Sequence, residues 1–461
     1  MAMGKRREQS PQQQIWVEAS RAEAPAHPFY KRLNKILAKH DFDTFVEQCC
    51  AKFYAEKLGR PSLPPAIYFR LLLVGFFEGI DSERGIAWRL ADSLSLREFI
   101  GLDLGSQTTN HSTISRTRRL IDLETHSEVF TWVVRVLAKE GLVHGKTLGV
   151  DATTLEANAA MRSIVRRDTG EGYDEFLVRL AEASGIETPT RSDLARFDRK
   201  REGRKTSNKD WEHPHDPDAR VTRMKDGRTH LAHKAEHAVD METGAILGVT
   251  IQPADRGDTS SLGETLDEAA EVLAAVLEDP EAAEKISERA MTELVADKGY
   301  HSNDVLIEQS ENELRTYISE PDRGRRNWDG KAEAKQAVYA NRRRTRGNRG
   351  QRLLRSRGEK VERTFAHCYE TGGMRRVHLR GHENIQKRVL IHDAGFNLGL
   401  LMRKLFGFGT PRALQGSFWA IFDAICAFLG FWLPSQRSEG SWRDRWADEW
   451  LFEPLVLEPI K

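Results

Sequence analysis

The sequence has few of the features that mark secreted, membrane-spanning or nucleotide-binding proteins. Its 461 residues include four cysteines, and no pair of them has CxxC spacing, so we expect reduced, mostly buried thiols in a cytosolic protein. The glycine motifs of P-loop and dinucleotide-binding proteins are absent, and we find no internal repeat. The formal net charge is only +1, which by itself does not indicate a nucleic-acid-binding protein.

Long apolar runs are also scarce. Residues 1–27 are polar and contain no apolar signal core, so we expect a disordered tail there. The most apolar stretch, Ser417 to Pro434, is shorter than the ~20 residues that a membrane-spanning helix needs, and Asp423 lies in its middle. We therefore expect a buried or partner-facing helix in this stretch, no membrane partner, and a cytoplasmic location.

What the sequence does contain is a helical pattern over residues 28–145. Apolar residues recur there at three- and four-residue steps, which predicts a helical domain. Within 82–121, a helix opening near Ser112 carries several arginines and follows another short helix and a polar turn. This arrangement is compatible with a helix-turn-helix that binds DNA through Arg116 and Arg119. The alternative is an ordinary helical domain with a solvated basic face.

Beyond residue 145 the pattern becomes that of an α/β domain. The sequence predicts a strand before Asp151, a charged insertion at about 160–228, a β-hairpin, and then alternating helices and strands. A basic segment at about 322–360 precedes a further helix. We expect the α/β domain to cover residues 146–378 and a helical C-terminal region to cover 379–461.

Three acids are placed to share one site. Asp151 and Asp297 each follow an apolar run that is typical of a buried strand, and strand ends are rigid places where side chains converge. Glu362 lies in a helix, at the edge of an apolar stripe formed by Val361 and Phe365. Phosphodiester chemistry commonly uses two divalent ions about 4 Å apart, held by oxygen ligands. The pattern predicts such a site, although aspartates after strands also form turns and helical glutamates are usually solvated.

A basic run precedes the third acid. Residues 341–360 contain many arginines and a single acid, Glu359. Such a run can hold backbone phosphates near the metal ions. We expect it to contact DNA through five arginines: Arg342, Arg343, Arg344, Arg346 and Arg355.

Other polar residues have structural as well as functional interpretations. The stretch HLAHKAEH contains three histidines: His230, His233 and His237. They suggest zinc, but no cysteine partner has metal-ligand spacing, so we expect hydrogen-bonded or DNA-proximal histidines. Asp216 and Asp218 are expected to make turns. Asp258 is expected to cap a helix or to support the metal ligands.

Several blocks of the sequence resemble those of DDE transposases from bacterial insertion sequences. In chain order they are TLGVDATTLEANAA, HKAEHAVDMETG, LVADKGYHS and RGEKVERTFAHCYETGGMRRVHLRG, after helical blocks such as HSTISRTRRLI. The resemblance covers about residues 29–414. It implies an α/β, RNase-H-like mixed sheet flanked by helices, preceded by an all-helical N-terminal domain and followed by a helical C-terminal region. It also implies metal-dependent cleavage and strand transfer at the ends of a mobile element.

The same resemblance assigns the site. The family's two aspartates fall on Asp151 and Asp297, and its glutamate falls on Glu362. All three would be catalytic and would bind two Mg²⁺ ions, with Mn²⁺ as a substitute. The implied partners are double-stranded DNA, as element ends and as target, and a second copy of the chain in a homodimer on DNA. The implied location is the nucleoid of a bacterial cytoplasm.

The match departs from the family pattern around the glutamate. Many relatives carry tyrosine and arginine before it and a basic residue after it, where this chain has Arg355, Gly358 and Tyr369. Because Arg355 has the family's spacing to Glu359, that residue is a rival third acid. The apolar neighbours of Glu362 favour Glu362. Two other functions also remain open: a DNA-binding regulator derived from a transposase, and an RNase-H-like nuclease that does not transpose.

Overall fold

The computed structural model describes residues 27–414, apart from 56–58, 60–61, 104–105, 187, 201–206, 225–226 and 325. Of the predicted tail over residues 1–27, all but residue 27 lies outside the described residues, and so does the predicted apolar helix between Ser417 and Pro434. Within the described part of the chain, no helix is long and apolar enough to cross a membrane.

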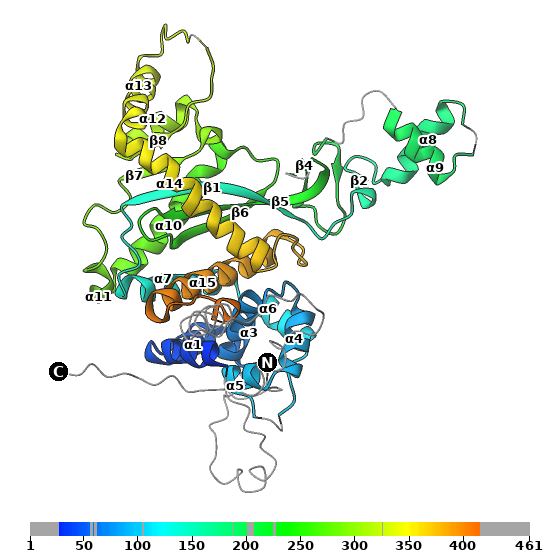
Figure 1. Ribbon diagram of the computed structural model, residues 1–461. Helices are drawn as coiled ribbons and strands as arrows, with labels where there is room; N and C mark the ends of the chain where they lie inside the picture. Colours follow the sequence, from blue (N-terminus) through cyan, green and yellow to red (C-terminus); the bar gives the residue numbers. More distant parts are fainter. Residues whose placement is uncertain are drawn as a thin grey trace, which may run out of the picture.

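The N-terminal part of the chain is helical, as the sequence predicts (Figure 1). The helices are α1 (Pro28–Lys39), α2 (Phe42–Cys50), α3 (Pro65–Glu78), α4 (Glu83–Asp92), α5 (Leu94–Ile100), α6 (His111–Leu120) and α7 (Leu123–Lys139). Helix α3 is apolar on all sides and almost entirely buried, because other helices surround it. The helical bundle is therefore built around α3.

The arginine-bearing helix α6 is positioned differently from the second helix of a short helix-turn-helix. It begins at His111, with the side chain of Asn110 as its cap, rather than at Ser112. Residues 101–110 separate it from α5, whereas the helix-turn-helix motif has a turn of about three or four residues. Helix α6 instead packs against α4. The polar segment before α6 is therefore longer than the turn of a short helix-turn-helix, and DNA binding by this region stays a prediction.

The second half of the chain forms the expected mixed sheet. Its strands are β1 (Thr147–Glu156), β4 (Arg220–Arg223), β5 (Thr229–Asp240), β6 (Ile246–Pro253), β7 (Glu293–Ala296) and β8 (Arg315–Ile318). The central strand β1 pairs with β5 on one side, antiparallel, and with β7 on the other, parallel. Strand β8 continues the parallel half, while β6 and β4 pair antiparallel with β5. The predicted order of hairpin, helix and strands is confirmed.

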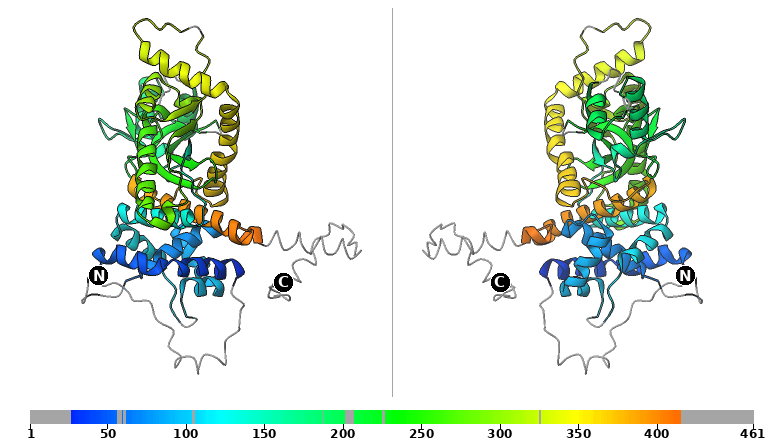
Figure 2. Two further views of the ribbon diagram at one scale, coloured as in Figure 1. Left: turned by 90° about the vertical axis from the view of Figure 1, so that its left-hand side faces the viewer. Right: turned by 90° about the vertical axis from the view of Figure 1, so that its right-hand side faces the viewer.

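Helices cover both faces of this sheet (Figure 2). They include α10 (Asp258–Leu277), α12 (Asn303–Glu311), α13 (Ala332–Arg346), α14 (Asn348–Phe365) and α15 (His382–Phe406), and the short α11 (Pro280–Ala283) packs on α7 and α10. Helix α10 packs on β5 and β6, and α14 crosses β1, β5, β7 and β8 on the opposite face. The RNase-H-like arrangement, with helical regions before and after the sheet, agrees with the expected fold.

The basic segment is helical rather than a separate stretch before the helix of Glu362. Helix α14 begins at Asn348, directly after α13 and Gly347, and not near Gly358. Its buried residues include Leu353 and Val361, which lie on one side of the helix, so the apolar stripe extends further back than expected. A six-residue π-helix, Ala366–Thr371, continues α14.

The predicted insertion projects beyond the end of β1 and the start of β5 (Figure 1). It contains β2 (Val165–Arg166), α8 (Tyr173–Ala183), α9 (Arg191–Lys200) and β3 (Trp211–Glu212), and it has a small hydrophobic cluster of its own. Asp216 and Asp218 lie at turns, as predicted. Their carboxylates also accept hydrogen bonds from the backbone N–H groups of Gly381 and His382, at 3.1 and 3.0 Å. The insertion thereby holds the start of α15.

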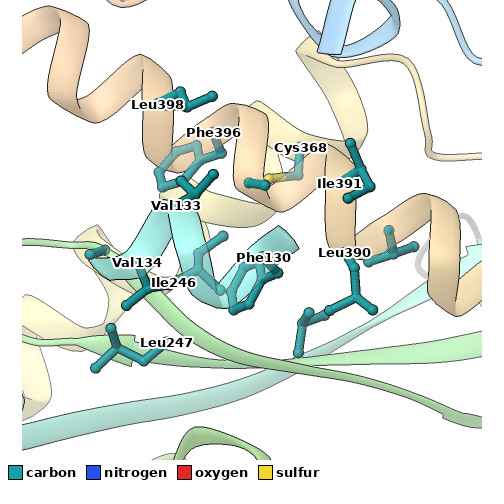
Figure 3. Close-up of a cluster of buried hydrophobic side chains, with 14 of the residues drawn as sticks. Phe130, Val133, Val134, Ile246, Leu247, Cys368, Leu390, Ile391, Phe396 and Leu398 are labelled. Carbon is teal, nitrogen blue, oxygen red and sulfur yellow. The ribbon is translucent and has the colours of Figure 1, made fainter. Parts of the chain in front are cut away.

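Helix α15 joins the N-terminal helices to the sheet. Figure 3 shows side chains of α7, β6, the π-helix and α15 meeting in one buried cluster, including Phe130, Ile246, Cys368 and Leu390. The helix also covers the outer edge of β6 with amide side chains. Asn397 donates to the Ile246 carbonyl at 2.8 Å and accepts from its N–H at 2.9 Å. These bonds satisfy an edge strand that would otherwise expose its backbone.

Candidate active site

The structure places Asp151 and Asp297 side by side. In the parallel β1–β7 pair, Val150 is opposite Ala296, so the next residue of each strand is one of the two aspartates. Asp297 directly follows β7, where its carboxylate accepts a hydrogen bond from the Gly299 N–H at 2.6 Å and starts a short 3-10 helix. Two residues far apart in the chain thus meet at one point of the sheet, as the sequence led us to expect.

Asp151 is not at a strand end, however. Strand β1 continues to Glu156, because β5 pairs with it along this whole length and places His237 opposite Asp151. The parallel neighbour β7 does end at this level. Asp151 therefore lies in a rigid, continuous strand but faces open space on one side, with 19% of its side chain exposed.

A guanidinium contacts the Asp151 carboxylate. Arg357 of α14 donates from Nη1 to Asp151 Oδ2 at 2.5 Å, and the Ala152 N–H donates to Oδ1 at 2.8 Å. Burial raises the pKa of Asp151, and the negative charge of Asp297 raises it further, while Arg357 and the Ala152 N–H oppose this rise. The aspartate pair thus forms a local concentration of negative charge that a nearby cation stabilises.

The register of α14 separates the two candidate third acids. Val361 anchors the helix over β1: a Cβ added to Gly149 would lie 2.9 Å from Val361 Cγ2. At about 100° per residue, Glu362 is roughly 100° round the helix from Val361, whereas Glu359 is roughly 160° from it, on the side away from the sheet. The helix register therefore favours Glu362 over Glu359 as the acid nearer to the sheet, and both side chains are exposed.

The three acids do not form a closed cluster. In the part of the chain that the structure describes, no group of three His, Cys, Asp or Glu side chains is close enough to hold a metal ion. The donor chemistry nevertheless suits a hard divalent cation, because all candidate ligands are carboxylates. The contact between Asp151 and a guanidinium shows that this position accepts positive charge. Asp151 and Asp297 would hold the metal, with Glu362 approaching from α14.

A buried polar network on the other face supports the aspartates. Glu236 is fully buried and accepts hydrogen bonds from the hydroxyls of Tyr300 at 2.6 Å, Thr265 at 2.5 Å and Ser261 at 3.0 Å. Tyr300 lies in the short 3-10 helix that Asp297 starts, so this network holds that turn against β5. We did not single out Glu236 from the sequence, although a glutamate inside the predicted strand THLAHKAEHAVD was a usable signal.

Asp258 has a different role from the expected helix cap. It is the first residue of α10, Gly257 is the N-cap, and no side-chain cap is formed. The Asp258 carboxylate pairs with Lys234 Nζ at 2.6 Å instead. A Cβ on Gly299 would lie 2.5 Å from Asp258 Oδ2 and 2.9 Å from Asp297 Oδ1, so Gly299 separates two carboxylates with no room for a side chain.

The three histidines have protein partners. His237 lies within 2.8 Å of Thr364 Oγ1 through Nδ1, and within 2.6 Å of the Tyr369 hydroxyl through Nε2. The Nε2 atom is also 3.1 Å from Asp393 Oδ2. His233 lies 3.4 Å from the Asp216 carboxylate, and His230 lies 3.8 Å from the Glu156 carboxylate.

Tyr369 occupies the position where relatives carry a basic residue. It is buried and holds β5 to the π-helix.

The arginines of α13 divide into two groups. Arg342 donates to Glu320 at 2.5 and 2.8 Å, which lowers the pKa of Glu320 to about 2. Arg344 donates to the carbonyl and hydroxyl of Thr316, both at 2.8 Å. Both side chains therefore have protein partners, and their expected phosphate contacts stay predictions. The other expected contacts, Arg343, Arg346 and Arg355, are exposed.

Helix α6 shows the same division. Arg118 is buried and bonds to Glu83 and to Asn384, which joins α6 to α4 and α15. Arg116 and Arg119 are exposed on this helix, and Arg116 makes its bonds within α6, to the Ser112 carbonyl at 3.2 Å and to Thr113. The two arginines selected from the sequence are thus the ones that remain accessible to a ligand.

Comparison with known proteins identifies two matching family models. Residues 18–120 match the model described as "Transposase domain (DUF772)", which spans α1 to α6. Residues 193–395 match the model described as "Transposase DDE domain". This second match contains Asp297 and Glu362, and Asp151 precedes it. Comparisons with curated proteins and with solved structures each found no match.

Proposed function

Because the chain belongs to the DDE transposases of insertion sequences, we propose that Asp151, Asp297 and Glu362 are the residues with which it cleaves and joins DNA. The family membership makes the chain an enzyme that breaks phosphodiester bonds and transfers strands, with divalent metal ions as cofactors. No observation favours a DNA-binding regulator or a nuclease that does not transpose.

The observation that carries the proposal is the Asp151–Asp297 pair. Two rigid, adjacent carboxylates at the level where β7 ends offer hard oxygen ligands, which suit Mg²⁺ and, as a substitute, Mn²⁺. We propose that two ions bind. When bound, they supply activation of the attacking oxygen and stabilisation of the leaving oxygen. Glu362 completes the ligand set from α14.

Exposed arginines provide the DNA contacts in this scheme. Phosphates of the substrate bind Arg343, Arg346 and Arg355, which lie on the helices that lead to Glu362. Arg116 and Arg119 on α6 read bases at the element ends. A mobile element has two ends, so two active sites are needed for concerted cutting. We therefore propose a homodimer on DNA, acting at the bacterial nucleoid.

The direct test is a cleavage assay on DNA that carries the element's own ends. We expect strand cleavage at those ends with Mg²⁺ or Mn²⁺, no cleavage in the presence of a chelator, and no cleavage by Asp297→Asn. A folded protein that binds the ends and never cuts them would contradict the proposed chemistry and would favour the regulator.

A further inference from the structure

Arg357 has a contact that none of the other arginines of α14 makes among the described residues. Its guanidinium bonds directly to Asp151 Oδ2, and 15% of the Arg357 side chain is exposed. The family pattern does not provide for it, because the expected arginine position before the glutamate is Gly358. The neighbouring Arg352 and Arg355 are exposed on the same helix. The Arg357 guanidinium therefore bonds to Asp151 through Nη1, while part of the side chain is accessible to solvent.

We propose that Arg357 is a positioning residue that holds Asp151 Oδ2 and yields this oxygen to a divalent cation when a DNA phosphate takes over its guanidinium. The inference rests on the proposed function, because it assumes that Asp151 is a metal ligand. It adds a regulatory property: metal binding and DNA binding become linked through one side chain.

The competition follows from charge and geometry. A divalent cation at Oδ2 would replace the donated hydrogen bond of Arg357 and would be repelled by the guanidinium if the arginine stayed in place. An arginine beside an aspartate ordinarily changes the aspartate's proton affinity by about ten- to a thousandfold. A cation that competes for the same oxygen should experience an effect of at least about tenfold.

A phosphate is a suitable acceptor for the displaced arginine. The planar guanidinium binds phosphate oxygens as well as carboxylates, and often with two parallel hydrogen bonds. The exposed Arg343, Arg346 and Arg355 draw the DNA backbone toward this helix. Because binding linkage is reciprocal, DNA should strengthen metal binding by the same factor by which the metal strengthens DNA binding.

The test measures Mn²⁺ binding through the loss of the EPR signal of free Mn²⁺, with no cleavage assay involved. Without DNA, Arg357→Gln should bind Mn²⁺ about tenfold more tightly than the wild type. The matched control is Arg352→Gln, which removes an equal charge from an exposed position of the same helix and should leave the affinity unchanged. Arg357→Lys, which keeps the charge, should remain close to the wild type.

The second measurement repeats the Mn²⁺ titration in the presence of a DNA duplex of random sequence. DNA itself binds Mn²⁺, so the same titration with Asp297→Asn and DNA gives the background to subtract. In the wild type, DNA should tighten Mn²⁺ binding, and in Arg357→Gln this gain should shrink by about the same factor that the variant gained without DNA. Thermal unfolding of each variant confirms that it is folded.

Two results would overturn the inference: equal or weaker Mn²⁺ binding by folded Arg357→Gln, or no coupling between Mn²⁺ and DNA in the wild type. The wild-type coupling needs no variant, so a misfolded Arg357→Gln would still leave the inference open to refutation. If Asp151→Asn leaves Mn²⁺ binding unchanged, the proposed metal site itself fails, which is a separate outcome.

Discussion

The two faces of the β1–β5 pair hold their charged residues in opposite ways. On the face toward α10, Glu236 is fully buried and three hydroxyls bond to it. On the face toward α14, Asp151 is partly exposed, and among the described residues its carboxylate bonds to the Ala152 N–H and to Arg357. Neighbouring positions of the two strands thus hold Glu236, whose hydrogen bonds are all within the protein, and Asp151, whose partner can be exchanged for another cation.

The difference shows that one face of the sheet carries polar residues that stabilise the fold, whereas the other carries the residues proposed for catalysis. Buried polar groups stabilise a fold only when all their hydrogen bonds are made, as they are around Glu236. A metal ligand must instead be able to release its partner. The arginines of α13 differ in the same way: Arg342 and Arg344 bond to other residues of the protein, whereas Arg343 and Arg346 are exposed.

The largest effect on activity is expected from removing the three acids of the candidate active site. Asp151→Ala, Asp297→Ala and Glu362→Ala should each lower strand cleavage by about a thousandfold or more, because each removes a metal ligand. Their unfolding free energies and affinities for end DNA should change little. The assay is cleavage of end DNA, with denaturant unfolding as the stability measurement. Glu359→Ala is the control; normal cleavage by Glu362→Ala and loss in Glu359→Ala would reverse our assignment.

Removing the buried Glu236 should instead lower the stability of the protein. Glu236→Ala leaves the Tyr300 hydroxyl without its buried acceptor and removes one of the two carboxylates near the Lys234 ammonium. We expect a loss of about 3 kcal/mol in the free energy of unfolding, measured in urea. Glu362→Ala in the same titration serves as the exposed comparison. A loss below about 1 kcal/mol would show that the network on this face contributes little to stability.

Gly299→Ala should damage the site without removing a charge. The added Cβ would collide with the carboxylates of Asp258 and Asp297, so one of them must move. A misplacement of about 1 Å can lower an enzymatic rate by roughly a hundredfold, which is the expected loss of cleavage. The control is Gly263→Ala in α10, where an added Cβ meets nothing within 4 Å. Equal activity of the two variants would contradict the tight placement of Asp297.

The arginines of α13 should separate into binding and structural pairs. Neutralising Arg343 and Arg346 together should weaken binding to random DNA by about tenfold and lower the log–log salt slope by about 0.9 for each phosphate that the protein no longer binds. Neutralising Arg342 and Arg344 should mainly lower the unfolding temperature, because their partners are Glu320 and Thr316. The measurements are salt titrations of DNA binding and thermal unfolding. An unchanged slope for the first pair would show that it does not bind phosphate.

The smallest effect is expected on α6. Arg116→Ala or Arg119→Ala should reduce the preference for element ends over random DNA by about fivefold or more, near the lower limit for removing one arginine that reads a base. Competition binding with end and random duplexes measures this ratio. Arg118→Ala should instead destabilise the protein, because Arg118 is buried against Glu83 and Asn384. Full end preference in both exposed variants would remove α6 as the reading helix.

Much of the architecture could be predicted from local patterns. Apolar runs that end at Asp151 and Asp297 indicated two strands, and the apolar neighbours of Glu362 indicated a helix with that residue at its edge. These signals are local, since they depend on the period of buried side chains within a few residues. The first helical region and the hairpin followed from the same kind of signal.

The sequence alone therefore determined the strands before Asp151 and Asp297, the hairpin, the order of the later helices and strands, and the helix that carries Glu362. Only the tertiary structure decided that β1 runs past Asp151, that α14 starts at Asn348, and that Arg357 reaches the site. It also decided which arginines of α13 stay exposed, because the four are alike in sequence and differ only in the neighbours that β8 and its following loop supply. Such pairings join residues far apart in the chain, and local periodicity carries no information about them.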